Sequence, residues 1–355
     1  MAELATNLMD GHRPLKIEVL INSPGPHDQV RVRDPFLALQ RLGVDCRIHE
    51  RPFRFNSCIR PHSLVIWQRP MPESRQRQWE HLQWLRERGC LLLTEWDDHP
   101  RLFPQKVQWE LARVQLAPLE LCHGIHTSSS QLAALLTPVN PVALVLDNTV
   151  ASIPPLNLSK HSTEGPLRVF IGNQNREQEH QQLIEPLREW LGEDPNVQLV
   201  IVGNRGLTRS LSADRLEIHP LLPYASYRQL LQNCHIALLP LGLNGANRCK
   251  TAIKWLECAA ESVAVVAGPE LYQRALGIES QGLVNQLDQI TPKAREFARD
   301  KQKRLNEISK AHNWVSSQGQ LKNQLIWRFN YYKKLWERRE VVDQKLTKRL
   351  NKLGF

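Results

Sequence analysis

The amino-acid sequence predicts an α/β protein with two doubly wound parallel sheets in one chain of 355 residues. Short apolar runs of strand length alternate with stretches of helical periodicity, which is typical of parallel sheets covered by helices. This alternation occurs twice, on either side of a Pro- and Ser-rich segment at 151–165. The chain length agrees, since a domain usually has ~150 residues.

In the first half, apolar and β-branched runs predict buried strands at 15–22, 46–49, 63–68, 91–94, 124–127 and 142–146. Helical spacing is expected over 32–42 and 72–88, with Gly43 and Gly89 ending these helices. A third helix begins at the serines 128–130 and runs to Leu136.

The second half repeats the pattern, with strands expected at 167–171, 197–202, 216–219, 236–240 and 263–267. Helices are expected over 179–191, 224–234 and 249–260, and from Thr291 onward. Because 151–165 lacks periodicity, we interpret it as a linker. The predicted organisation is an N-terminal Rossmann-like domain at 1–152, a second one at 153–312 and a C-terminal helical extension at 313–355.

The net charge of +10 is concentrated in the tail, which has ten basic and three acidic residues from Gln318 onward. Val342, Leu346, Leu350 and Leu353 form an apolar stripe flanked by lysines. Such a helix is expected to lie on an anionic membrane surface as a peripheral contact, or to be a solvated helix or an oligomer contact. No nucleic-acid-binding motif is present, so no nucleic-acid partner is expected.

Other features limit the class of protein. Seven scattered cysteines without a CxxC pair argue against a disulfide framework and a zinc cluster. Cys122, His123 and His126 are interpreted as parts of a buried strand and its approach. No apolar run reaches the ~18 residues of a membrane helix, and the N-terminus lacks the apolar region of a secretory signal. A cytoplasmic location is therefore expected.

In doubly wound sheets, ligands bind beyond the carboxyl ends of the strands. Asp97 and Asp98 follow the strand at 91–94, where adjacent carboxylates can orient a hydroxyl or act as a base, and His99 can accept a proton. Alternatively, the aspartates cap or close a turn and His99 is a turn residue. Gly25 permits close backbone approach or a turn, and Ser128 contacts phosphate or caps a helix.

The segment 249–260 is the most informative. On a helix, Lys250, Lys254 and Glu257 share one face. Two lysines at i, i+4 repel each other, and a helix N-terminus disfavours positive charge. We therefore infer an anion at this helix start, with Glu257 accepting hydrogen bonds from a ribose or sugar hydroxyl. The alternative is a solvated basic face in which Glu257 is a local ion-pair partner.

The order and spacing of these segments resemble GT-B glycosyltransferases, in particular family-4-type retaining enzymes and a bacterial subgroup of them. The resemblance covers roughly residues 15 to 335. The segments that carry it are the strand ends at Gly172 and Gly203, Lys250-Thr251-x-x-Lys254-x-x-Glu257, Asp147-Asn148-Thr149-Val150, Arg31-x-Arg33-Asp34-Pro35 and Glu95-Trp96-Asp97-Asp98-His99-Pro100.

The resemblance implies two Rossmann-like domains facing a cleft, with a nucleotide-sugar donor bound by the second. The donor-binding residues it implies are Gly172, Asn173, Arg176, Gly203, Tyr224, Asn247, Cys249, Lys250, Thr251, Lys254 and Glu257. On the acceptor side it implies Arg31, together with Gly25 and Ser128. Tyr224 can equally have a packing role. Cys249 stands where the family has the first Glu of its E-x7-E motif, which is a departure.

What the resemblance implies is a glycosyltransferase that moves a sugar, with retention, from a nucleotide-diphosphate sugar to a glycan, lipid-linked or protein acceptor. Cations around the leaving diphosphate would stabilise the transition state, so neither a metal nor another cofactor is expected. The alternative is a non-catalytic GT-B-like protein that binds nucleotide-sugar or a partner in a glycan-assembly complex. The replacement of an acidic residue by Cys249 motivates that alternative.

Overall fold

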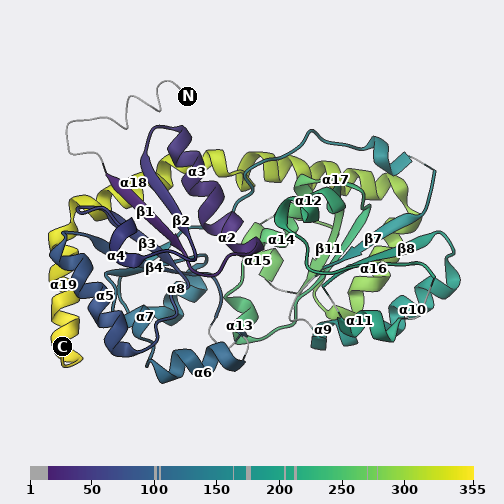
Figure 1. Cartoon of the computed structure of the whole chain (residues 1–355). Coiled ribbons are helices and arrows are strands. Elements are labelled where there is room, and N and C mark those ends of the chain that lie inside the picture. Colours follow the sequence, from purple (N-terminus) through teal and green to yellow (C-terminus); the bar gives the residue numbers. More distant parts are fainter. Residues whose placement is uncertain are drawn as a thin grey trace. The chain divides into compact units, whose positions relative to one another are not determined.

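The computed structural model describes residues 15–99, 102–103, 105–162, 164–172, 177–203, 205–211, 214–269, 271–277 and 279–355. The chain divides into two compact units. Unit 1 comprises the chain up to Asp147 together with Leu321–Phe355, and unit 2 comprises Asn148–Gln320. In Figure 1 the purple N-terminal elements and the yellow helices α18 and α19 therefore belong to the same unit.

Unit 1 contains a six-stranded parallel sheet in the order β2-β1-β3-β4-β5-β6. The strands are β1 (Lys16–Ile21), β2 (Asp45–Glu50), β3 (Leu64–Gln68), β4 (Leu91–Trp96), β5 (Gly124–Thr127) and β6 (Ala143–Val145). The helices are α2 (Pro26–Asp28), α3 (Asp34–Arg41), α4 (Phe55–Cys58), α5 (Arg75–Glu87), α6 (Gln105–Arg113), α7 (Ala117–Glu120), α8 (Ser130–Leu136), α18 (Leu325–Glu337) and α19 (Arg339–Lys352). A π-helical turn (Gln29–Arg33) connects α2 to α3.

One face of this sheet packs against α3 and α18, and its core joins the two ends of the chain. Ile17 and Ile66 from the strands lie in one apolar cluster with Phe36 of α3 and Phe329 of α18. The rings of Phe36 and Tyr332 stack with centroids 5.7 Å apart. The C-terminal helices are thus an integral part of unit 1.

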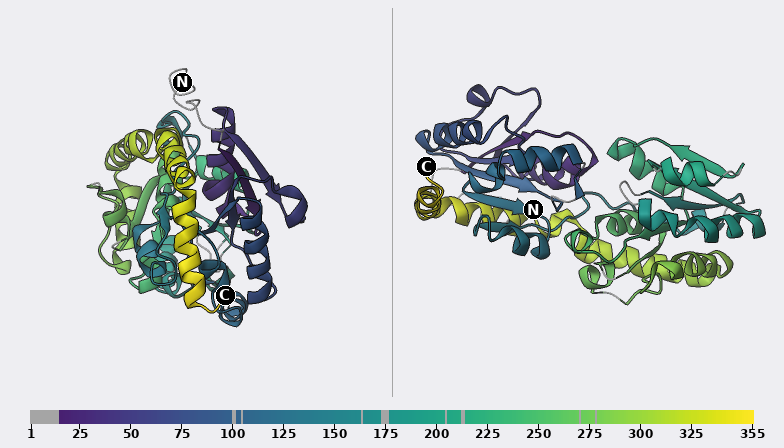
Figure 2. Two further views of the ribbon diagram at one scale, coloured as in Figure 1. Left: turned by 90° about the vertical axis from the view of Figure 1, so that its left-hand side faces the viewer. Right: turned by 90° about the horizontal axis from the view of Figure 1, so that it is seen from below.

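The apolar stripe of the last helix is largely buried, so the stripe is not the surface through which this helix could contact a membrane. Val342, Leu346 and Leu350 pack into unit 1, and only Leu353 is exposed. The helix α19 runs along the outside of the unit, in front in the left view of Figure 2. No helix in the described ranges is both long and apolar enough to cross a bilayer.

Unit 2 contains a five-stranded parallel sheet in the order β11-β10-β7-β8-β9. The strands are β7 (Leu167–Ile171), β8 (Val197–Val202), β9 (Leu216–His219), β10 (Ile236–Pro240) and β11 (Ala264–Gly268). The helices are α9 (Glu177–Gln181), α10 (Ile184–Glu193), α11 (Arg205–Ser210), α12 (Tyr224–Gln232), α13 (Gly245–Arg248), α14 (Ile253–Ala260), α15 (Leu271–Leu276), α16 (Ile290–Arg299) and α17 (Lys301–Trp314).

The predicted fold class is confirmed, and five strands have the predicted bounds: β5, β7, β8, β9 and β10. Two predicted helices were wrong in extent. The helix expected at 249–260 begins only at Ile253, because α13 ends at Arg248 and the chain is non-helical at Lys250 and Thr251. The helix expected at 179–191 is divided into α9 and α10.

Within unit 2, two neutral histidines fix the segment 151–165 near the amino ends of β10 and β11. The His161 ring nitrogen Nε2 lies 3.0 Å from the carbonyl of Ser262, and His235 Nε2 lies 3.3 Å from the carbonyl of Lys160. The backbone N–H of Arg168 donates to His235 Nδ1. Burial lowers the pKa of His161 to about 3 and that of His235 to about 4, from 6.5.

These pKa values predict that acid destabilises unit 2. Below pH ~6.5 the unfolded chain binds protons that the folded state excludes, so the stabilisation is complete above that pH. It is lost as the pH falls from 6.5 toward 4 and 3. We expect the Tm of the wild type to fall over this range, and that of His161→Gln/His235→Gln to fall less. The exposed-site variant His62→Gln should follow the wild type; equal slopes for all three proteins would contradict the assignment.

Candidate functional site

The strand order of each sheet points to one place for a ligand. In unit 1 the order reverses between β1 and β3, and in unit 2 between β7 and β10. Doubly wound sheets bind ligands beyond the carboxyl ends of the strands at such a switch point. The segments after these four strands are therefore the ones to inspect in each unit.

In unit 1, an arginine that the sequence analysis did not single out lies at the switch point and connects the ends of the neighbouring strands. Arg69 follows β3 and has a left-handed backbone (φ 44°), which is uncommon for a residue other than glycine. Its carbonyl accepts a hydrogen bond from Asn22 Nδ2 (2.9 Å), after β1, and its N–H donates to the carbonyl of Glu95 (3.0 Å). These bonds hold the strained conformation in place, as is found at functional sites.

The Arg69 guanidinium engages the two predicted catalytic aspartates. Its Nη2 lies 2.6 Å from Asp97 Oδ1 and 3.4 Å from Asp98 Oδ2, and it stacks over the Phe103 ring at 5.1 Å. Burial alone would raise the pKa of Asp97, but neighbouring positive charge, above all that of Arg69, outweighs burial and lowers it. Asp97 is therefore ionised and oriented, while Asp98 is the more exposed carboxylate of the two (24% against 12%).

Arg31, predicted on the acceptor side, is buried and forms the central ion pair of unit 1. Its Nε donates to Glu95 Oε1 (2.7 Å), and its Nη1 donates to the carbonyl of Leu146 (2.7 Å). Both side chains are essentially inaccessible to solvent. Burial raises the pKa of Glu95, and the charge of Arg31 opposes that rise. The pair thus keeps a charged residue inside β4, where an apolar one would be usual.

The remaining predicted residues of unit 1 have modest roles in the structure. The backbone of Gly25 is extended (φ 169°), and its N–H donates to Asp28 Oδ1 (2.6 Å). Ser128 Oγ donates to the carbonyl of Asp97 (3.3 Å), while the neighbouring Ser129 caps α8. His99 is half-buried, two residues after Asp97. Ser128 and Asp97 are thus brought together.

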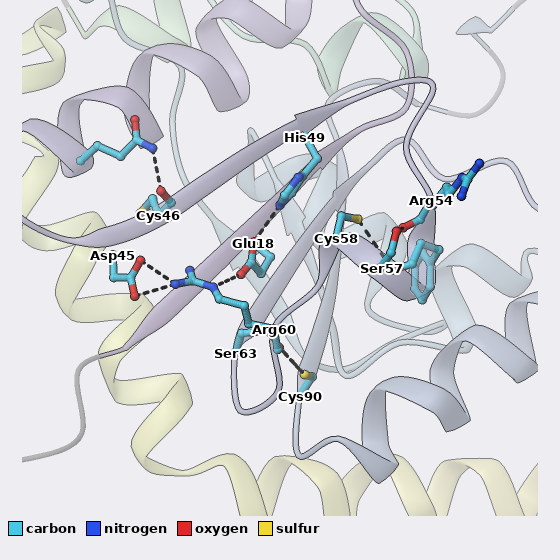
Figure 3. Close-up of polar contacts among 12 residues, drawn as sticks. Glu18, Asp45, Cys46, His49, Arg54, Ser57, Cys58, Arg60, Ser63 and Cys90 are labelled. Carbon is cyan, nitrogen blue, oxygen red and sulfur yellow. Dashed lines mark hydrogen bonds and ion pairs between the residues drawn. The ribbon is translucent and has the colours of Figure 1, made fainter.

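Halfway along β1, unit 1 buries a further carboxylate. Figure 3 shows Glu18 facing His49 and Arg60, with Asp45 beyond. His49 Nε2 lies 2.8 Å from Glu18, and Arg60 pairs with Glu18 and, at 2.8 Å, with Asp45. Because these partners come from β2 and from the segment leading into β3, the cluster stabilises the sheet away from the carboxyl edge.

In unit 2, a buried carboxylate shapes the loop after β10. Glu179 Oε1 accepts hydrogen bonds from the backbone N–H of Gly242 (3.2 Å) and from Asn247 Nδ2 (3.1 Å). Asn247, a predicted donor-binding residue, is buried and also donates to the carbonyl of Gly242 (2.8 Å). Glu179, in α9, therefore holds Asn247 in place in the segment after β10, where the nucleotide is predicted to bind.

The predicted anion-binding segment is a helix break. Lys250 and Thr251 lie in the non-helical stretch between α13 and α14, and Thr251 Oγ1 accepts a hydrogen bond from Asn148 Nδ2 (2.8 Å). Cys249 is buried, and burial raises the pKa of its thiol, so the thiol is neutral at pH 7. The thiol therefore does not supply the negative charge of the first Glu of the E-x7-E motif, whose position Cys249 takes.

Lys254 and Glu257 form a compact cluster with Tyr227 of α12. Lys254 Nζ lies 3.6 Å from Glu257 Oε2 and 4.7 Å from the centre of the Tyr227 ring. Burial, followed by the charge of Glu257, raises the pKa of the Tyr227 hydroxyl, which donates to Glu257 Oε2 (3.1 Å). Glu257 is buried, unlike in the alternative of a solvated face, and Lys254 remains partly exposed.

Other predicted donor residues are placed as follows. Gly203 directly follows β8 with φ 72°, a left-handed conformation that favours glycine. A Cβ at Gly172 would meet the Phe170 ring at 2.1 Å. Tyr224 begins α12, and its hydroxyl accepts a hydrogen bond from Arg228 (3.2 Å). Asn173 and Arg176 lie outside the described residues.

Sequence reasoning missed Arg69, Glu179 and Tyr227. Arg69 directly follows a predicted strand, which was the available signal, and Glu179 begins a predicted helix, but the partners of both are distant in sequence. Among the described residues, no group of three or more His, Cys, Asp or Glu side chains is arranged to hold a metal ion.

Two doubly wound parallel units in one chain, with the C-terminal helices packed on the first, define the GT-B architecture, and solved GT-B structures match this chain. An alpha-glucosyltransferase in complex with UDP-glucose and DNA containing an abasic site has a TM-score of 0.62 at 12% identity. That match covers 92% of this chain and 100% of the other.

Two further structures come from S. aureus. MnaA with UDP has a TM-score of 0.51 at 12% identity, over 90% of this chain and 97% of that one. A TarM variant in complex with fondaparinux, alpha-GlcNAc-glycerol and UDP has a TM-score of 0.53 at 10% identity, over 75% of this chain. The match spans about half (54%) of the TarM chain. No family model and no curated protein match the sequence. At these identities, the likeness establishes the fold.

Proposed function

We propose that this protein is a glycosyltransferase of the family-4 type, which moves a sugar from a nucleotide-diphosphate sugar to an acceptor hydroxyl with retention. The observation that carries this proposal is the segment after β10, beside the switch point of unit 2. There Lys250 precedes α14, and Lys254 of α14 pairs with the buried Glu257. The GT-B fold, and the UDP or UDP-glucose in the solved structures above, support it.

In this proposal, the two lysines bind the diphosphate and Glu257 binds the ribose. As the sugar–phosphate bond breaks, negative charge grows on the leaving diphosphate, and preorganised cations stabilise it. The lysines then supply the charge that a metal ion supplies elsewhere. In unit 1, Arg69 holds Asp97 ionised, and Asp98 orients the acceptor hydroxyl or receives its proton. The acceptor class is a glycan, a lipid-linked molecule or a protein, at the cytoplasmic side of the cell.

A second candidate is a GT-B protein that binds nucleotide-sugar without transferring it. The neutral, buried thiol of Cys249 favours this alternative, because the donor segment lacks one carboxylate of the related motif. Turnover separates the two candidates: only a transferase releases nucleotide diphosphate from a nucleotide-sugar.

The test is thermal stabilisation by UDP, GDP, ADP and dTDP without added metal. A ligand at 100 times its Kd stabilises the folded state by about 2.7 kcal/mol. We expect one nucleotide to raise the Tm selectively, and the matching nucleotide-sugar to release diphosphate during incubation. Stabilisation without release would support the binding protein, and no stabilisation by any of the four would contradict both candidates.

A further inference from the structure

The last helix presents a row of lysines to solvent. Lys345, Lys348 and Lys352 follow one another in α19 at intervals of three and four residues, which places them on one side of the helix. All three are exposed, and so is Val341 on the same side one turn earlier. These three lysines are called the lysine row below.

The lysine row has no carboxylate partner within the described part of the chain. The acid in the middle of the helix, Asp343, is already paired with Arg86 (2.7 Å) and His123 (3.1 Å). Two more exposed cations, Lys334 at the end of α18 and Arg338 in the turn that follows, also lack a carboxylate partner there. Because like charges three and four residues apart repel, this arrangement is unfavourable unless an anion lies outside the helix.

The helix that carries the row is fixed in place. Its apolar side is closed against unit 1 by Val342, Leu346 and Leu350. Arg349 is also directed inward, where it donates to the carbonyls of Glu120 and Cys122. The helix therefore has no free apolar face to insert into a lipid phase, and it presents its lysines on a rigid support.

We propose that the lysine row, with Lys334 and Arg338, docks this protein electrostatically on an anionic lipid bilayer. Clusters of four to eight cations on a helix are typical of anionic lipid binding. Headgroups are mobile and require no fixed geometry, which suits lysines as point charges. Nucleic-acid phosphates favour the arginine fork, whereas the row consists of lysines and the neighbouring Arg349 is used within the protein.

The position of the row decides how such docking affects the candidate site. The helix α19 contacts Arg86, Cys122 and His123, which precede β4 and β5, so it lies at the amino edge of the unit 1 sheet. Asp97 and Asp98 follow β4 at the carboxyl edge. Lipid contact through α19 thus leaves the carboxyl edge of unit 1 uncovered.

The experiment is co-sedimentation of the full chain with vesicles of phosphatidylcholine alone and with one quarter phosphatidylglycerol. We expect binding to the anionic vesicles only, and release at about 0.5 M salt, where the screening length is about 4 Å. Lys345→Gln/Lys348→Gln/Lys352→Gln should lower the partition coefficient by roughly 100-fold, since each lysine near such a surface contributes about fivefold.

The matched control is Arg299→Gln/Lys301→Gln/Lys310→Gln, which removes the same charge from exposed positions in unit 2. It should bind the vesicles like the wild type. Both triple variants change exposed side chains, and the lysine row makes no ion pair with a described carboxylate. Both variants should therefore keep the wild-type Tm. Equal losses in the two triple variants would attribute binding to net charge and overturn the proposal. Tighter binding to duplex DNA than to anionic vesicles at the same salt concentration would overturn it as well.

Discussion

Replacement of Arg31 by methionine is expected to lower the free energy of unfolding of unit 1 by about 3–5 kcal/mol. The variant leaves Glu95 in the sheet with its counter-charge removed, and both side chains are almost fully buried. Burial already raises the pKa of Glu95, and Arg31 opposes this rise, so the variant should take up a proton at this carboxyl. Denaturant unfolding, followed by Trp fluorescence, measures the change.

The double variant Arg31→Met/Glu95→Gln distinguishes a lost ion pair from lost packing. Replacing both partners removes the uncompensated charge, so most of the stability should return. The surface pair Arg77–Glu80 provides the control, since both side chains are about half exposed, and Arg77→Met should cost less than about 1 kcal/mol. A stability of Arg31→Met within that range would show that Glu95 does not depend on its partner.

Replacing Lys254 or Lys250 by methionine is expected to weaken nucleoside diphosphate binding by about 10- to 100-fold. Each lysine in the proposed site makes a charge-assisted hydrogen bond to the diphosphate, worth about 1.5–3 kcal/mol. Lys254 is held near this position by Glu257 and the ring of Tyr227, so Lys254→Arg should retain part of the affinity. Isothermal titration with the nucleotide that stabilises the wild type measures the loss.

The control for net charge is Lys301→Met, which replaces an exposed lysine on α17. This variant should bind the nucleotide like the wild type. Wild-type affinity in both Lys250→Met and Lys254→Met would remove the proposed diphosphate site, whatever the protein binds elsewhere. A loss confined to Lys254→Met would restrict the site to the start of α14.

Much of the fold was predictable because the two sheets are parallel and buried on both faces. Their strands are continuous apolar runs that end at Gly or Pro, as at Gly172, Gly203 and Pro240. The end of β4 was less clear, because Glu95 interrupts the apolar run. Its charge is neutralised by Arg31, 64 positions earlier in the chain, and a local pattern contains no such information.

The candidate site was predictable where it depends on position after a strand, and not where it depends on pairing. Asp97 follows a strand, so its position alone marked it. Arg69 is an unremarkable turn residue in sequence; its left-handed backbone and its contact with Asp97 emerge only when β3 and β4 are adjacent. Likewise, helical spacing placed Glu257 beside the two lysines but gave no sign that Tyr227 of α12 packs against it.

Because residues 321–355 return to unit 1, the two units finish folding in a fixed order during synthesis. Synthesis proceeds from the N-terminus, and domains fold as units while it does. Unit 2 is one uninterrupted stretch, so all its strands have been made before the last helices exist. Unit 1 must wait, because Leu325, Phe329 and Tyr332 belong to its core. The half that is made first is therefore completed last, with its sheet open on one face in the interval.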